Sequence, residues 1–97
     1  MYEGKYIIYK ITDLEGKIRS VSQEHYNDAP GNIALLVPNY HFCFQFDEYT
    51  NNNRGVLKTT FVQGVKHVGD EIIVTTSNSI YYLKPFKLDI HWNLSYN

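Results

Sequence analysis

The chain has 97 residues, and 15% of them are aromatic: nine tyrosines, five phenylalanines and one tryptophan. Nine basic and ten acidic residues give a formal net charge of −1, without the basic excess typical of proteins that bind duplex nucleic acid. The length predicts one domain over residues 1–97 with a single modest core. The single cysteine excludes an internal disulfide and any zinc site built on several thiolates.

The N-terminal sequence and the apolar runs indicate where to expect the protein. Residues 1–9 lack the charged and then apolar arrangement of a signal peptide. The longest apolar runs, such as residues 33–37, are far shorter than the roughly 20 residues that a helix needs to span a bilayer. We therefore expect a cytoplasmic protein with a free thiol and no membrane contacts.

The first third of the chain predicts strands joined by polar turns. Residues 5–12 and 17–22 carry Ile, Val and Tyr, and the turn residues at 13–16 between them predict a β-hairpin. Asn, Asp, Pro and Gly mark residues 24–32 as a connecting loop. The apolar run at residues 33–37 is compatible with a buried strand or with one turn of helix.

Two further segments alternate between apolar and polar residues, which is the pattern of a strand with one apolar face. Residues 40–46 place four aromatic rings on one face of the strand: Tyr40, Phe42, Phe44 and Phe46. We expect the three phenylalanines in the core. Residues 86–95 follow Pro85, which is tolerated at the start of a strand. Their apolar positions are Phe86, Leu88, Ile90, Trp92 and Leu94.

Residues 56–84, which follow a polar loop at 47–55, predict an antiparallel meander. Gly64 marks a bulge or bend, and turns are expected at residues 69–70 and 77–78. The strands between them are expected at residues 56–62, 65–68, 71–76 and 79–84. Six to eight short strands with little helix predict an all-β fold, either a small antiparallel barrel or a compact two-layer sheet.

The chain contains none of the short motifs that bind phosphates or present a nucleophilic serine. Cys43 would need a histidine to act as a nucleophile, and His41 stands two positions away on the same strand face; the alternative is a small buried hydrophobe. The four histidines lack the spacing of a metal site, and the paired carboxylates fall at predicted turns. We therefore expect no enzyme activity, no metal and no cofactor.

Four tyrosines cannot all face the same side of a sheet. Tyr81 and Tyr82 are adjacent, and Tyr6 and Tyr9 have opposite parity, so at least two of the four face outward. Outward tyrosines are typical of protein interfaces. The acidic, Asn-rich loop 47–54 is either a second contact or a solvated connector. The candidate binding residues are Tyr6, Tyr9, Tyr40, Tyr49, Arg54, Tyr81, Tyr82 and Trp92.

The C-terminal residues 86–97 have two interpretations. They complete the core, or they form an arm that docks on another chain by strand addition or exchange, giving a homodimer. The alternative to a protein partner is single-stranded nucleic acid, which small β-barrels with exposed aromatics bind. The scattered positions of the lysines argue against that alternative, because the nucleic-acid backbone needs a positive groove.

Within residues 56–84 the motif Val62-x-x-Val65 is followed by Asp70-x-Ile72-Ile73-Val74-x-Thr76-x-Asn78-Ser79-x-Tyr81-x-Leu83. This hairpin resembles one found in small uncharacterised proteins of bacteria, phages and mobile elements, and it covers under a third of the chain. The resemblance implies accessory proteins that bind and modulate host or phage machinery, such as inhibitors of a defence system. We therefore expect a small non-catalytic binding protein that acts through protein–protein contacts.

Overall fold

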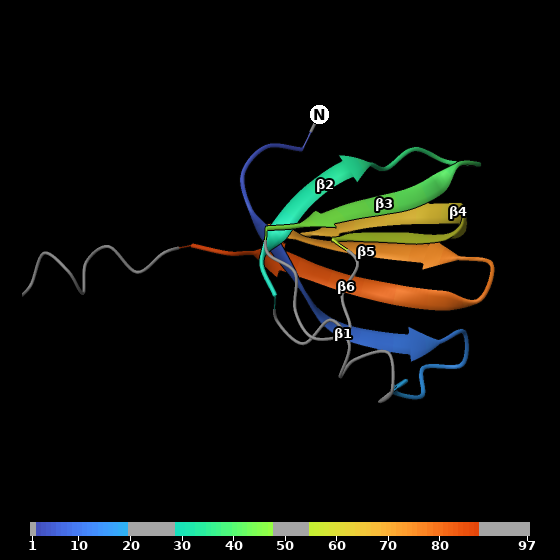
Figure 1. The fold of residues 1–97 in the computed structure, drawn as a ribbon. Coiled ribbons are helices and arrows are strands. Elements are labelled where there is room, and N and C mark those ends of the chain that lie inside the picture. Colours follow the sequence, from blue (N-terminus) through green and yellow to red (C-terminus); the bar gives the residue numbers. More distant parts are fainter. Residues whose placement is uncertain (1, 20–28, 48–54, 88–97) are drawn as a thin grey trace, which may run out of the picture.

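The computed structural model describes residues 2–19, 29–47 and 55–87. This part of the chain contains no helix, and its six strands are antiparallel neighbours in sequence order around a closed barrel (Figure 1). The predicted all-β fold is confirmed, and of its two alternatives the structure adopts the small antiparallel barrel. The strands are β1 (Tyr6–Asp13), β2 (Gly31–Leu35), β3 (His41–Phe46), β4 (Val56–Val68), β5 (Glu71–Thr76) and β6 (Ser79–Pro85).

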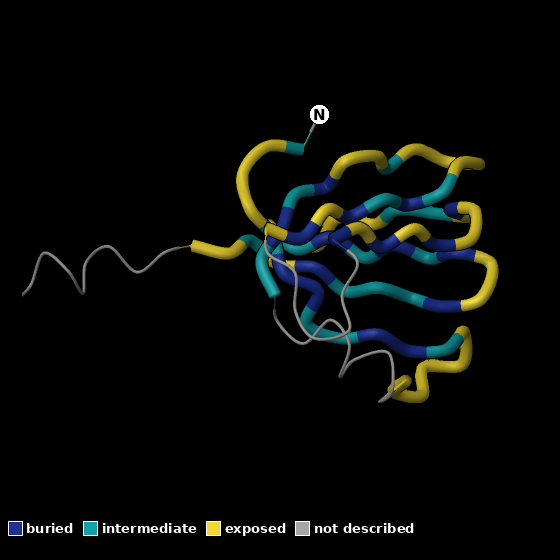
Figure 2. Tube along the Cα trace, viewed as in Figure 1, coloured by how far each residue is buried: buried dark blue, intermediate teal, exposed yellow. Residues whose placement is uncertain are grey.

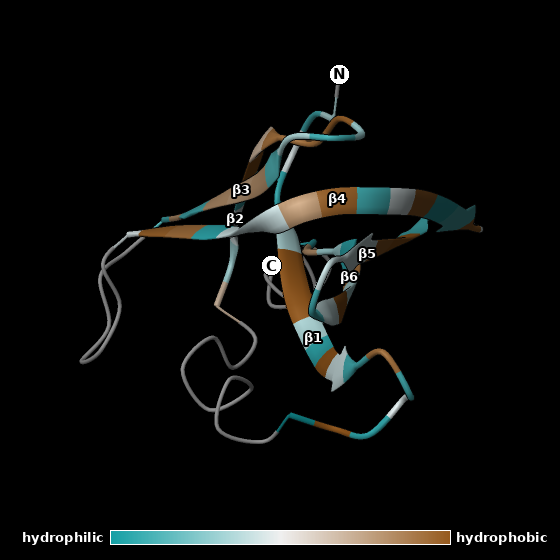
Figure 3. Cartoon of the chain, turned by 90° about the vertical axis from the view of Figure 1, so that its right-hand side faces the viewer, coloured by the Kyte–Doolittle hydropathy of each residue, from teal (hydrophilic) through white to brown (hydrophobic). Residues whose placement is uncertain are grey.

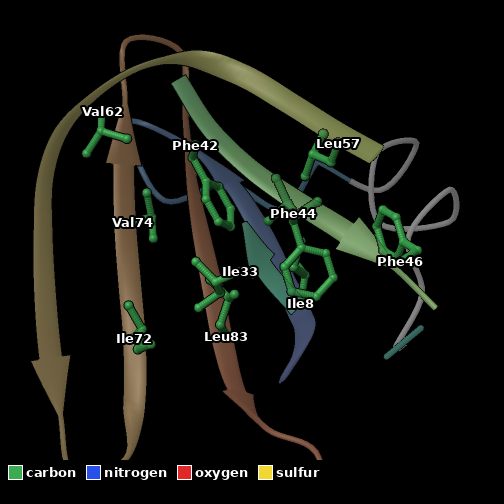
Figure 4. Close-up of a cluster of buried hydrophobic side chains, with 11 residues drawn as sticks. Ile8, Ile33, Phe42, Phe44, Phe46, Leu57, Val62, Ile72, Val74 and Leu83 are labelled. Carbon is green, nitrogen blue, oxygen red and sulfur yellow. The ribbon is translucent and has the colours of Figure 1, made fainter. Parts of the chain in front are cut away.

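The core is built from the apolar positions that alternate along the strands. Phe42, Phe44 and Phe46 of β3 are buried as predicted, and their rings meet edge to face with centroids 6.3 and 5.0 Å apart. Around them pack Ile8 of β1 and Leu83 of β6, both fully buried (Figure 4). Each buried ring or branched side chain contributes about 2–3 kcal/mol of favourable apolar burial, so this cluster is the main apolar contribution to folding among the described residues. The exposed residues concentrate in the turns (Figure 2).

The strand β4 is longer than the sequence predicts, because the expected strands at 56–62 and 65–68 form one strand of thirteen residues. Its first half pairs with β3 and its second half with β5, and the register shifts between Val62 and Gly64. This shift confirms the bulge expected near Gly64. A bulge bends a strand without ending it, so β4 turns the corner of the barrel, and bands of apolar and polar residues follow one another along it (Figure 3).

Two sequence-based boundaries differ from the structure. Of the second hairpin strand expected at 17–22, residues 20–22 lie outside the described residues. Residues 17–19 form one isolated antiparallel bridge, between Thr12 and Ile18, and no regular strand. The carboxylate of Asp13 accepts hydrogen bonds from the backbone N–H groups of Glu15 and Lys17, at 2.8 and 2.9 Å, and so holds the chain in a turn. These bonds lower the pKa of Asp13, with the bond from Lys17 as the largest cause.

The second difference concerns Pro85 and the ambiguous segment at 33–37. Pro85 does not begin a strand: it ends β6, opposite Tyr6 of β1. The next backbone N–H, that of Phe86, donates a hydrogen bond to the backbone oxygen of Lys5 at 2.9 Å. The segment at 33–37 belongs to a strand through Leu35 and not to a helix. The expected strand at 86–95 lies outside the described residues from residue 88 onward.

The barrel closes at a single registered pair between β1 and β2, Tyr6 with Gly31, and the two strands diverge beyond it (Figure 1). Gly31 is also registered with Phe46 of β3. A Cβ atom at Gly31 would lie 2.3 Å from the backbone oxygen of Gln45 and 2.6 Å from a ring carbon of Phe44. Only glycine permits this approach, so the closing point depends on the absence of a side chain.

We predict that Gly31→Ala destabilises the barrel by at least about 2 kcal/mol, because the added methyl group meets a backbone atom that cannot move away. Chemical denaturation monitored by circular dichroism measures the effect. The matched control is Gly64→Ala, where an added Cβ meets nothing within 4 Å. We expect the control to change stability by no more than about 0.5 kcal/mol, and equal losses in the two variants would contradict the role of Gly31.

Candidate binding surface

The Cys43 and His41 side chains do not form the pair that nucleophilic catalysis would need. The ring nitrogen Nδ1 of His41 contacts the backbone oxygen of Thr59, and the ring packs on Phe61 with centroids 4.7 Å apart. No hydrogen bond joins His41 to Cys43 in the described part of the chain. The imidazole ring of His41 therefore contacts Thr59 and Phe61 and not the thiol of Cys43. Within residues 2–19, 29–47 and 55–87, no three His, Cys, Asp or Glu side chains gather as metal ligands would.

The tyrosine pairs separate as strand parity predicts. Tyr6 and Tyr81 turn inward and pack against the core, and the Tyr81 ring lies edge to face with Phe42 at 5.8 Å. Tyr9 and Tyr82 turn outward and lie beside each other, with ring centroids 6.2 Å apart. The structure thus joins two of the residues that the sequence nominated and assigns two others to the core.

A register shift in β1 places Tyr9 and its neighbour Lys10 on the same outer face. Ile8 pairs with Leu83 and Lys10 with Tyr82, so Tyr9 is an extra residue without a partner of its own in β6. In a bulge of this kind two residues oppose one on the neighbouring strand. Both Tyr9 and Lys10 therefore flank the outward ring of Tyr82.

Pairing across the strands extends this face into a row. Lys66 of β4 is registered with Ile73 of β5, Ile73 with Tyr82 of β6, and Tyr82 with Lys10 of β1. Each of these residues adjoins a position that points into the barrel, so all four lie outside. Strands are spaced about 4.8 Å apart, so the row spans roughly 14 Å. We call the surface formed by Tyr9, Lys10, Lys66, Ile73, Tyr82 and Lys84 the tyrosine–lysine face.

Lysine ammonium groups lie over both tyrosine rings of this face. The Nζ atom of Lys10 is 4.2 Å from the ring centroid of Tyr82, and that of Lys84 is 5.1 Å from the ring centroid of Tyr9. Such cation–π contacts contribute about 0.5–1 kcal/mol each at exposed sites. They hold the ammonium groups beside the rings, so positive charge and aromatic surface are presented together.

The hydroxyl of Tyr9 donates a hydrogen bond to the carboxylate of Glu71, the residue that begins β5. Burial, as the largest cause, together with the hydrogen bond to Glu71 and its negative charge raises the pKa of Tyr9 to about 12. Tyr9 therefore remains a neutral donor throughout the physiological range. The bond also fixes the ring orientation, which reduces the rotamer entropy that a binding event would remove.

The remaining candidate residues lie elsewhere. Tyr40 is 61% exposed in the turn before β3 and takes no part in the tyrosine–lysine face. Three candidate residues lie outside the described residues, and so does the loop at 48–54: Tyr49, Arg54 and Trp92. Sequence reasoning missed Lys10, Lys84 and Glu71 as members or neighbours of the site. Of these three, only Lys84 shares strand parity with Tyr82 in the sequence. The register shift that brings Lys10 beside the rings, and the contact of Glu71 with Tyr9, depend on strand pairing that the sequence does not show.

Comparison of the chain with family models, curated proteins and solved structures finds no match. None of the described residues forms a helix long and apolar enough to cross a membrane. The surface chemistry of the barrel is therefore the basis for a functional proposal.

We predict that Tyr9 stays protonated at a pH between 10 and 12 while the barrel is folded. A folded pKa above the unfolded value of about 10 stabilises the fold fully below that value. The contribution is lost as the pH rises through about 12. Nuclear magnetic resonance of isotope-labelled tyrosine, assigned with Tyr9→Phe, measures the titration.

The control variant is Glu71→Gln, which keeps a hydrogen-bond acceptor but removes the charge. We expect its Tyr9 to titrate at a lower pH than in the wild-type protein, and still above 10 because burial remains. A wild-type midpoint near 10 would contradict the contact between Tyr9 and Glu71.

Proposed function

We propose that this chain is a small non-catalytic binding protein that acts through protein–protein contacts, with the tyrosine–lysine face as its contact surface. The observation that carries the proposal is the side-by-side placement of Tyr9 and Tyr82, each ring with a lysine ammonium over it. Tyrosine supplies a large contact area with few rotatable bonds, and such rings are enriched at the energetic centres of interfaces.

The charges of the face specify the chemistry of the partner. The ammonium groups of Lys10 and Lys84 lie over the rings, and Lys66 stands in the same row on β4. The adjacent carboxylate of Glu71 already accepts a hydrogen bond from the Tyr9 hydroxyl. A complementary surface carries carboxylates around an apolar or aromatic centre that packs on Tyr82 and Ile73. The partner we propose is therefore a protein with an acidic patch.

The resemblance of the hairpin at 56–84 to proteins of phages and mobile elements supports a biological setting for this binding. In that setting the chain is an accessory protein that occupies an acidic surface of host machinery and so inhibits it. Binding through one small face suits this role, because a protein that inhibits by covering a surface of its partner needs no catalytic activity.

Single-stranded nucleic acid is the second candidate ligand, because the structure gathers three lysines with two tyrosines on one face although they are scattered in the sequence. Bases stack on exposed aromatic rings while lysines contact the phosphates. We rank this candidate second because the ammonium groups of Lys10 and Lys84 already cover faces of the two rings. A stacking base would have to displace them.

We predict that Tyr82→Ala weakens binding of the protein partner by about 30-fold, the loss typical of a central tyrosine. The partner is first isolated by capture from a native lysate with the wild-type chain, and titration calorimetry then compares the variants. The matched control is Tyr40→Ala, which removes an exposed tyrosine outside the face. A loss in the control without a loss in Tyr82→Ala would contradict the assignment of the surface.

A fluorescent single-stranded oligonucleotide tests the second candidate directly. If protein is the ligand, we expect only weak binding of the oligonucleotide. Tight binding that weakens steeply with salt and is lost in Tyr82→Ala would replace the protein partner by nucleic acid.

A further inference from the structure

Glu71 and Lys84 lie side by side at the tyrosine–lysine face, on neighbouring strands. Ile72 of β5 is registered with Leu83 of β6, and in an antiparallel pair the residue before Ile72 lies opposite the residue after Leu83. Ile72 and Leu83 are buried, so Glu71 and Lys84 both point outward. Side chains opposite each other in this way have Cβ atoms about 5 Å apart, which places the carboxylate and the ammonium group within reach of an ion pair.

The structure does not pair these two charges. Among the described residues, the carboxylate of Glu71 accepts a hydrogen bond from the hydroxyl of Tyr9, and the only ion pair joins Lys5 to Asp47. The ammonium group of Lys84 lies instead over the Tyr9 ring, 5.1 Å from its centroid. Glu71 and Lys84 therefore both contact Tyr9 and do not contact each other as an ion pair.

Tyr9 reaches both groups because of its place in the sheet. The register shift in β1 leaves it without a partner of its own in β6, and β6 lies between β1 and β5. The contact of the Tyr9 hydroxyl with Glu71 of β5 therefore carries the tyrosine side chain across the outer face of β6. A hydrogen bond to a charged carboxylate is stronger than an ion pair between exposed side chains, which solvent and salt screen. The hydroxyl of Tyr9 is therefore the preferred partner of Glu71.

The contact between Tyr9 and Glu71 decides what Lys84 presents to solvent. Lys84 is exposed, and its charge is not neutralised by the carboxylate on the neighbouring strand. An ammonium group that was already paired with Glu71 would have to give up that pair before it could meet a carboxylate of another protein. Electrostatic complementarity across an interface requires charges that are available when the two surfaces meet.

We propose that Tyr9 is a positioning residue, whose hydroxyl holds the Glu71 carboxylate away from Lys84 and so keeps the Lys84 ammonium group available to a carboxylate of the partner. This inference rests on the proposed function, because it takes the tyrosine–lysine face as a surface that binds an acidic protein. It gives the Tyr9 hydroxyl a role separate from the contact area of the Tyr9 ring.

The chemical reactivity of Lys84 tests this arrangement without a partner. An amine-reactive ester modifies exposed lysines, and mass spectrometry of the digested protein measures the rate at each one. Tyr9→Phe keeps the ring but releases the Glu71 carboxylate, so at low salt we expect Lys84 to react about threefold more slowly because of its new ion pair. Lys10, whose ammonium group lies over Tyr82, is the internal control and is expected to keep its rate.

Glu71→Gln separates the positioning role from a general effect of the lost hydroxyl. In the Glu71→Gln background there is no competing carboxylate, so we expect Tyr9→Phe to leave the Lys84 rate unchanged. A Lys84 rate that Tyr9→Phe does not alter in the wild-type background, or an equal fall in both backgrounds, would overturn the inference. Either result would leave the proposed contact surface intact.

A fluorescent polyglutamate peptide gives the second measurement, because it offers the carboxylates that the proposed partner would carry. We expect Tyr9→Phe to weaken its binding about threefold in the wild-type background and not in the Glu71→Gln background. A wild-type chain that does not bind polyglutamate, or binding that neither Lys84→Gln nor Tyr82→Ala weakens, would contradict the proposed function. The role of Tyr9 in binding would then fail with it, even if the rates at Lys84 change as expected.

Discussion

Ile8 and Ile11 of β1 are both fully buried although they stand three positions apart, which strict alternation along a strand does not allow. The register shift at Tyr9 resolves this conflict, because one extra residue restores inward parity for Ile11. The same extra residue places Tyr9 and Lys10 together on the outside. The packing requirement of the core and the composition of the tyrosine–lysine face are therefore two consequences of one bulge.

Register shifts in β2 and β4 also bend the sheet of the barrel. The register shift near Ala34 falls within β2, and the shift before Gly64 lies where β4 passes from β3 to β5. Glycine at position 31 then permits the single close approach at which β1 and β2 meet. Beside this registered pair, the side chain of Asn32 donates a hydrogen bond to the backbone oxygen of Gly4 at 3.1 Å and so adds to the contact between the two ends of the sheet.

Much of this fold was predictable from the sequence, since it depends on local periodicity and turn chemistry. The alternation around Phe42 and Phe44 identified the core strand, and the parity of Tyr81 and Tyr82 divided the tyrosines between core and surface. The neighbours of the outward tyrosines were not predictable. Lys10 and Lys84 reach the rings across strand pairs far apart in sequence, and the register of those pairs is set by a bulge that no local pattern marks.

The register shift at Tyr9 is the central structural claim, and proton–proton contacts measured by nuclear magnetic resonance test it most directly. We expect cross-peaks between the Tyr9 ring and the Lys84 methylenes, and between the Tyr82 ring and those of Lys10. We also expect cross-peaks from both Ile8 and Ile11 to other side chains of the barrel interior. Cross-peaks from Lys10 to the interior, with Ile11 in contact with solvent-facing residues, would show regular alternation and contradict the account.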